Sequence, residues 1–171
     1  MATCKYCGKS GWFLSLTDVG LCDDCAQVLQ PQINRAVQII TESVEIVNKS
    51  KNPETKLSRL DIIEEITNKH LRPFEEKGIE VTEGQSPFQI LAYVRDFRDK
   101  IILESLKSVL DEAKIKAEKA KTPKAKMNAY SKVLQRIVKW KEKVSNPHII
   151  VDVESEVKEL INKHSKNEQV G

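Results

Sequence analysis

Four cysteines within the first 25 residues constrain this chain of 171 residues more than any other feature. They form two C-x2-C pairs, Cys4 with Cys7 and Cys22 with Cys25. Two intervening residues let both thiolates of a tight turn face one ion, and two such turns complete a tetrahedral sulfur site. Because so short a segment has almost no hydrophobic core, the metal would supply the folding free energy. The sequence therefore predicts one metal site held by these four residues.

The residues around the cysteines predict the local structure of this N-terminal segment. Gly8 follows the first pair and allows the backbone to turn back with its amides towards the sulfurs. The largely apolar residues 12–16 predict a strand of a small hairpin, followed by a turn at residues 17–20. Cys25 leads directly into an apolar sequence and is preceded by two acidic residues, which is typical of a helix N-terminus.

A knuckle, a hairpin and a helix that carries the second cysteine pair resemble the treble-clef family of zinc fingers. The resemblance covers residues 1–30 only. It implies that Cys4, Cys7, Cys22 and Cys25 bind one structural zinc ion per chain. Treble clefs serve nucleic-acid binding, protein binding and some catalysis, so the resemblance does not choose a function.

Other uses of the four cysteines stay open. A rubredoxin-like iron site also has two C-x2-C units, but it usually carries a glycine in both knuckles, and the second unit here has none. A redox-active zinc site or dithiol is a further alternative, although Asp23 and Asp24 disfavour a reactive thiolate. An open catalytic zinc needs a vacant position, and no histidine lies nearby to replace one sulfur.

Composition favours a mainly helical protein of the cytoplasm. The chain is 31% charged and only 5% aromatic, which argues against an all-β sandwich or barrel. Its start does not resemble a secretory signal, and no apolar run approaches the roughly 18 residues of a membrane span. We therefore expect no membrane partner and a reducing compartment, where paired cysteines bind metal or do redox work instead of forming disulfides.

The rest of the chain predicts an antiparallel helical bundle over residues 31–165, after a zinc-finger head of residues 1–30 and before a polar tail of residues 166–171. Apolar residues recur at helical spacing from Ile33 to Val47, and Pro31 marks either a kink or a fresh helix start. Capping residues followed by proline mark later helix starts at Asn52-Pro53, Ser86-Pro87 and Thr122-Pro123. Asn146-Pro147 interrupts the last of these helices, and apolar residues from Val153 to Ile161 suggest a short final helix.

A shift of 70 residues places Asn52-Pro53 on Thr122-Pro123, which suggests two helical hairpins of similar design. Duplication and coincidence both explain this weak repeat, because a capping residue followed by proline is a common helix start. The apolar stripe of residues 33–47 is equally able to pack within the chain or against a second copy, so a homo-oligomer is also open.

Positive charge is concentrated in one segment. Residues 114–143 carry eleven basic and two acidic side chains, a net charge of +9 in a chain whose total is +3. This hairpin is either a solvated helical face or a surface for the phosphate backbone of nucleic acid. Lysine outnumbers arginine ten to one here, so such binding would be weakly sequence-specific. The candidate contacts are Lys114, Lys119, Lys121, Lys124, Lys126, Lys132, Arg136 and Lys139, with Trp140 or Tyr130 for base stacking if exposed.

No pattern of catalytic residues accompanies the cysteines. The three histidines lie far apart in sequence, and no glycine-rich phosphate loop occurs. We therefore expect a non-enzymatic, zinc-binding interaction or scaffolding protein whose helical module binds a protein partner. The alternative is a nucleic-acid-binding protein that uses the zinc finger together with the basic hairpin of residues 114–143.

Overall fold

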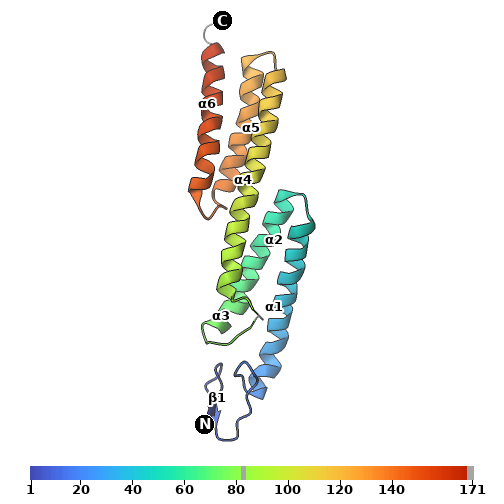
Figure 1. Ribbon diagram of the computed structural model, residues 1–171, viewed down its shortest axis with the longest axis vertical. Helices are drawn as coiled ribbons and strands as arrows, with labels where there is room; N and C mark the ends of the chain where they lie inside the picture. Colours follow the sequence, from blue (N-terminus) through green and yellow to red (C-terminus); the bar gives the residue numbers. More distant parts are fainter. Residues whose placement is uncertain (82–83, 169–171) are drawn as a thin grey trace. The chain divides into compact units, whose positions relative to one another are not determined.

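The computed structural model describes residues 1–81 and 84–168 (Figure 1). It is mainly helical, as the sequence predicts, with one small two-stranded sheet in the described part of the chain. The chain divides into two compact units, Met1–Val94 and Arg95–Gly171. Their boundary falls inside helix α4 (Pro87–Lys119), so the predicted helical bundle of residues 31–165 spans both units.

The first unit begins with the cysteine head and a long helix. Strands β1 (Ala2–Thr3) and β2 (Ser10–Gly11) pair in antiparallel fashion, with Ala2 opposite Gly11. Helix α1 (Asp23–Lys49) then runs without interruption through Pro31, so this proline marks neither a helix start nor a helix end. The apolar stripe of α1 is directed inward, and Ile33, Ala36, Ile40 and Val47 are buried.

The predicted strand at residues 12–16 is wrong. In the structure the paired strands flank the first cysteine turn, and the later segment makes only an isolated bridge between Leu16 and Cys22. Trp12 and Phe13 are 81% and 102% exposed. The two aromatic side chains of this segment therefore face solvent, while Leu14 and Leu16 are half-buried without forming a strand.

The next helices begin where the capping signals predict. Helix α2 (Pro53–Ile66) has Asn52 as its cap, whose side chain accepts a hydrogen bond from the Glu54 N–H at 2.9 Å. A π-helical turn η1 (Thr67–Leu71) and the short helix α3 (Arg72–Glu75) continue it. Pro73 has no N–H to donate to the carbonyl four residues earlier, and the wider η1 turn ends two residues before this proline.

A capping box starts α4, as predicted. The Ser86 N–H donates to Gln89 Oε1 at 2.9 Å, and the Gln89 N–H donates to Ser86 Oγ at 3.2 Å. Helix α5 (Pro123–Lys141) begins in the same manner as α2, because Thr122 Oγ1 accepts the Ala125 N–H at 3.2 Å. The two helical hairpins thus share their turn chemistry, which fits the 70-residue repeat without deciding between duplication and coincidence.

The second unit contains the end of α4 together with α5, the 3-10 turn η2 (Pro147–Ile150) and helix α6 (Val151–Glu168). Asp99 on α4 holds the turn before η2, since its carboxylate accepts the N–H groups of Ser145 and Asn146 at 2.7 and 3.1 Å. Helix α6 extends into the predicted polar tail as far as Glu168, and residues 169–171 lie outside the described part of the chain.

Trp140 is the largest fully buried side chain of the second unit and belongs to the buried face of α5, together with Tyr130, Val133 and Ile137. We expect Trp140→Ala to lower the free energy of unfolding of this unit by about 3–5 kcal/mol, because it removes a large apolar group and leaves a cavity. Val138→Ala on the same helix is the control, since Val138 is 71% exposed. Urea denaturation followed by far-ultraviolet circular dichroism measures both, and equal effects would contradict the burial of Trp140.

Candidate metal centre

The first cysteine pair lies on a tight turn between β1 and β2. The Cys4 N–H donates to the Lys9 carbonyl, and the Gly8 N–H donates to the Cys4 carbonyl, both at 2.9 Å. Gly8 has a φ of 74°, a left-handed conformation that glycine adopts without a steric penalty. These bonds hold Cys4 and Cys7 on one knuckle, in the place where the sequence predicts it.

The second pair lies at the N-terminus of α1. Cys22 is the residue that caps this helix, and Cys25 lies in its first turn. The N–H of Cys22 donates to Cys4 Sγ at 3.3 Å, which ties the helix start to the first knuckle. Leu21, next to Cys22, is fully buried and anchors the same segment. The predicted helix N-terminus at the second pair is therefore confirmed.

The four sulfur atoms form one cluster. All of them lie within 4.8 Å of one another, and the Sγ atoms of Cys7 and Cys22 are 3.8 Å apart. All four cysteines are free, and 3.8 Å is far longer than the roughly 2.05 Å of a disulfide bond. Four sulfurs placed tetrahedrally at about 2.3 Å from one zinc ion would be separated by about 3.8 Å. The cluster therefore has the dimensions that a metal ion requires.

The electrostatics of the cluster also suit a cation. Backbone N–H groups of Cys7 and Cys22 lower the pKa of the Cys4 thiol to about 6. Desolvation, followed by hydrogen bonds with the neighbouring thiols, raises the pKa of the Cys25 thiol to about 12. Thiolates this close repel one another, so full ionisation of the set needs a compensating positive charge. A metal ion would supply it.

The first knuckle also contacts the chain beyond α3, at residues about 70 positions away in sequence. Lys5 Nζ donates to the Gly78 carbonyl at 2.8 Å, and Lys77 Nζ donates to the Tyr6 carbonyl at 3.4 Å. The Lys77 ammonium lies 4.1 Å from the centroid of the Tyr6 ring, which in turn lies 5.9 Å from the ring of Phe74. Sequence patterns carry no signal for these contacts, and we did not predict them.

The basic residues predicted as nucleic-acid contacts lie on α4, on α5 and in the turn between them. Lys114 forms an ion pair with Glu156 at 2.7 Å, and this pair raises the pKa of Lys114. The charge of Lys114 is therefore already paired within the protein. Lys126 is half-buried. The exposed members are Lys119, Lys121, Lys124, Lys132, Arg136 and Lys139.

The two aromatic residues considered for base stacking are not available. Trp140 is 0% exposed and Tyr130 is 4% exposed, so both belong to the core of the second unit. Arg136 covers the edge of this core, with its guanidinium carbon 5.4 Å from the Trp140 ring centroid. The sequence offers Trp140 as a stacking residue only if it is exposed, and its burial excludes that role in this fold.

Comparison with models of protein families, with curated protein sequences and with solved structures finds no match to this chain. In the described part of the chain, no helix combines the length and the apolar composition that crossing a membrane requires. The four cysteines form the one close group of three or more metal-ligating side chains among the described residues. The candidate site is therefore defined by its own geometry.

We expect Cys22→Ser to abolish metal binding and to unfold residues 1–22, because the remaining three sulfurs leave the ion with an incomplete ligand set. Most of the helical circular dichroism should remain, since the helices have their own buried faces. The control is Lys9→Ala, which removes only an exposed ion pair with Asp24 at 3.3 Å. Loss of the whole helical signal in Cys22→Ser would instead show that the head is integral to the core of the first unit.

Proposed function

We propose that this protein binds one structural zinc ion through Cys4, Cys7, Cys22 and Cys25 and acts as a non-enzymatic interaction module. The observation that carries the proposal is the cluster of four sulfurs within 4.8 Å of one another. A set of four thiolates suits zinc, and four protein ligands leave no open coordination position for a substrate or water. The metal would then stabilise a head that presents surfaces of the first unit to a protein partner.

Metal analysis of protein purified without added zinc tests the first part of this proposal. We expect about one zinc per chain, released when the thiols are modified, because the ion is held by thiolates alone. Replacement by cobalt should give the visible absorption of a tetrahedral thiolate site. Bound iron with visible absorption would point to a rubredoxin-like centre, and free thiols that bind no metal would refute the site.

A second candidate function is electrostatic binding of nucleic acid by the second unit. The observation in its favour is the set of exposed basic residues around the turn between α4 and α5, which includes Lys119, Lys121 and Lys124. Lysine lacks the planar, forked guanidinium group with which arginine recognises bases, and no exposed aromatic side chain lies on α5. This surface therefore favours contacts with phosphates over recognition of bases. Binding through this surface would therefore depend strongly on salt and little on sequence.

Titration of fluorescent single- and double-stranded DNA and RNA at two salt concentrations tests this second candidate. We expect affinity to fall steeply with salt, and to be lost in a variant with Lys121, Lys124 and Lys126 changed to Glu, because released counterions drive such binding. The control changes Lys51, Lys69 and Lys107 to Glu, which alters the net charge equally at other positions. Equal losses in both variants would exclude a defined surface, and no binding would exclude the function.

A further inference from the structure

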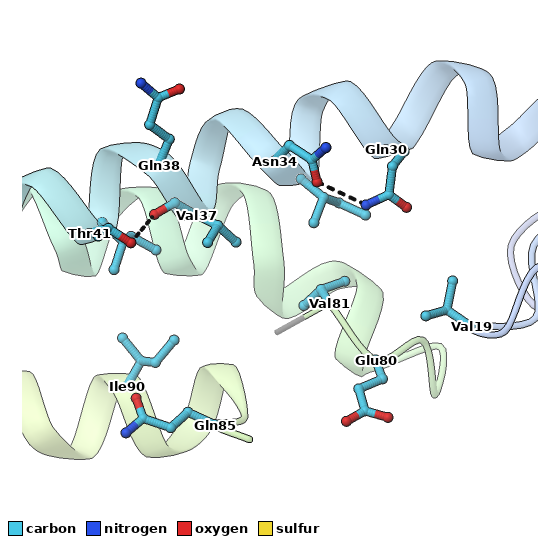
Figure 2. A pocket seen from close by; sticks show the side chains of 12 residues that line it. Val19, Gln30, Asn34, Val37, Gln38, Thr41, Glu80, Val81, Gln85 and Ile90 are labelled. Atoms are coloured by element: carbon cyan, nitrogen blue, oxygen red, sulfur yellow. Dashed lines mark hydrogen bonds between the residues drawn. The ribbon is translucent and has the colours of Figure 1, made fainter. Parts of the chain in front are cut away.

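The cysteine cluster does not lie in the groove of the first unit. This groove of about 870 Å³ lies along α1 (Figure 2), and none of the four cysteines is among its twelve described lining residues. Its polar side chains are bonded locally, since Gln30 donates to Asn34 Oδ1 and Thr41 Oγ1 donates to the Val37 carbonyl, both at 2.9 Å. Chemistry on the sulfurs therefore depends on how far each cysteine is itself exposed at the surface of the head.

The four cysteines differ in their exposure to solvent. Cys4 and Cys22 are only 1% and 2% exposed, and Cys25 is half-buried. Cys7 is the one exposed member of the set. Oxidants react with thiolates that solvent reaches, and redox-sensitive cysteines typically lie next to a second thiol. Cys7 is therefore the point at which a dissolved oxidant meets the cluster first.

Hydrogen bonds separate Cys4 from Cys7 further. The Cys4 sulfur accepts the Cys22 N–H at 3.3 Å, and the backbone N–H groups of Cys7 and Tyr6 bond to it as well. Such bonds stabilise the negative charge of a thiolate and weaken it as a nucleophile. The described contacts of the Cys7 sulfur are with other cysteine sulfurs. Cys7 therefore keeps the reactivity that burial and N–H groups remove from Cys4.

Cys22 provides the second thiol. Its sulfur lies 3.8 Å from Cys7 Sγ, although the two residues are 15 positions apart in sequence. Cys7 belongs to the first knuckle and Cys22 caps α1, so the pair joins two separate elements. A disulfide requires the sulfurs to approach to about 2.05 Å. A small movement of the knuckle against the helix start supplies this approach without rearranging either cysteine turn.

The acidic residues beside the second cysteine pair do not remove this reactivity. Asp23 and Asp24 disfavour a reactive thiolate when the sequence is considered alone. In the structure, however, the Asp24 carboxylate forms an ion pair with Lys9 Nζ at 3.3 Å. Lys9 follows Cys7 by two residues, so a positive charge accompanies this negative one. A cysteine that binds a metal is also already a thiolate, whatever its neighbours are.

We propose that Cys7 is a site of reversible oxidation by hydrogen peroxide and that Cys22 forms a disulfide with it. The Cys7 thiolate attacks one peroxide oxygen, the O–O bond breaks, and hydroxide leaves while Cys7 becomes a sulfenic acid. The Cys22 thiolate then attacks the Cys7 sulfur, forms the S–S bond and displaces a second hydroxide. Two protons from solvent convert both hydroxides to water. The two thiolates lose two electrons, and the peroxide gains them.

This disulfide breaks up the metal site. Only the thiolates of Cys4 and Cys25 remain, whereas structural zinc needs four ligands, so the protein releases the ion. Without the ion the head loses its order, together with the hydrogen bonds from the first knuckle to residues 77 and 78. A dithiol reductant and zinc reverse the change. The inference rests on the proposed function, because it adds regulation to the same zinc site.

Hydrogen peroxide added to the full-length, zinc-loaded protein tests the inference. We expect release of about one zinc per chain, followed with a chromogenic chelator, and loss of two of the four free thiols. Peptide mapping should find one disulfide, between Cys7 and Cys22, and dithiothreitol with zinc should restore the starting state. Zinc that stays bound, release without a disulfide, or a disulfide that joins other cysteines would each overturn the inference.

Trapping of the first oxidation product identifies the residue that reacts with the peroxide. Dimedone forms a stable adduct with a sulfenic acid, and mass spectrometry locates the adduct in the chain. We expect the early adduct at Cys7, because it is the exposed thiol. An early adduct at Cys4, Cys22 or Cys25 contradicts this order of reaction. The experiment uses the unmodified sequence, so its outcome does not depend on how a variant folds.

Two histidine variants provide a matched comparison. Cys7→His and Cys4→His each remove one thiol and keep four zinc ligands, since three cysteines and one histidine also hold structural zinc. We expect peroxide to release zinc from Cys7→His at least about tenfold more slowly than from the original protein, and from Cys4→His without such slowing. Metal content before treatment establishes that each variant is loaded. Equal release rates in the two variants overturn the role of Cys7.

The outcomes also distinguish the inference from the proposed function. A protein that holds about one zinc per chain and keeps it in peroxide overturns the inference and leaves the zinc site intact. A protein that binds no metal overturns the proposed function and the inference together.

Discussion

The cluster of four cysteine sulfurs is the interaction on which the first 25 residues depend. This segment contributes only a two-residue strand pair, an isolated bridge and one buried leucine beside the ligands, so it has little apolar surface of its own to bury. The sulfurs lie at the spacing of a tetrahedral metal site, and their mutual repulsion as thiolates is relieved by a cation. A bound ion would thus stabilise the head and set the start of α1, whose first turn carries the last ligand.

The head also contacts residues that lie far from it in the sequence. Lys5 and Tyr6 lie between Cys4 and Cys7, and their hydrogen bonds with residues 78 and 77 connect the candidate metal site to the chain that follows α3. These side-chain contacts link the head to the helices of the first unit, and both belong to one compact unit.

Agreement between prediction and structure follows from the range of the interactions involved. The helix starts at Asn52, Ser86 and Thr122 were predictable because a cap bonds to N–H groups two or three residues away. The strand expected at residues 12–16 failed for the opposite reason, since apolar residues favour a strand only where another surface covers them. Trp12 and Phe13 have no such cover, and their exposure makes them a surface feature of the head.

The sequence by itself determined the four candidate metal ligands, the order of the helices and the basic character of residues 114–143, because ligand spacing, capping and charge are properties of short stretches of chain. Only the tertiary structure decided which side chains are accessible. It placed Trp140 in a core and paired Lys114 with Glu156. Burial and pairing depend on neighbours that are distant in sequence, and no local pattern records those neighbours.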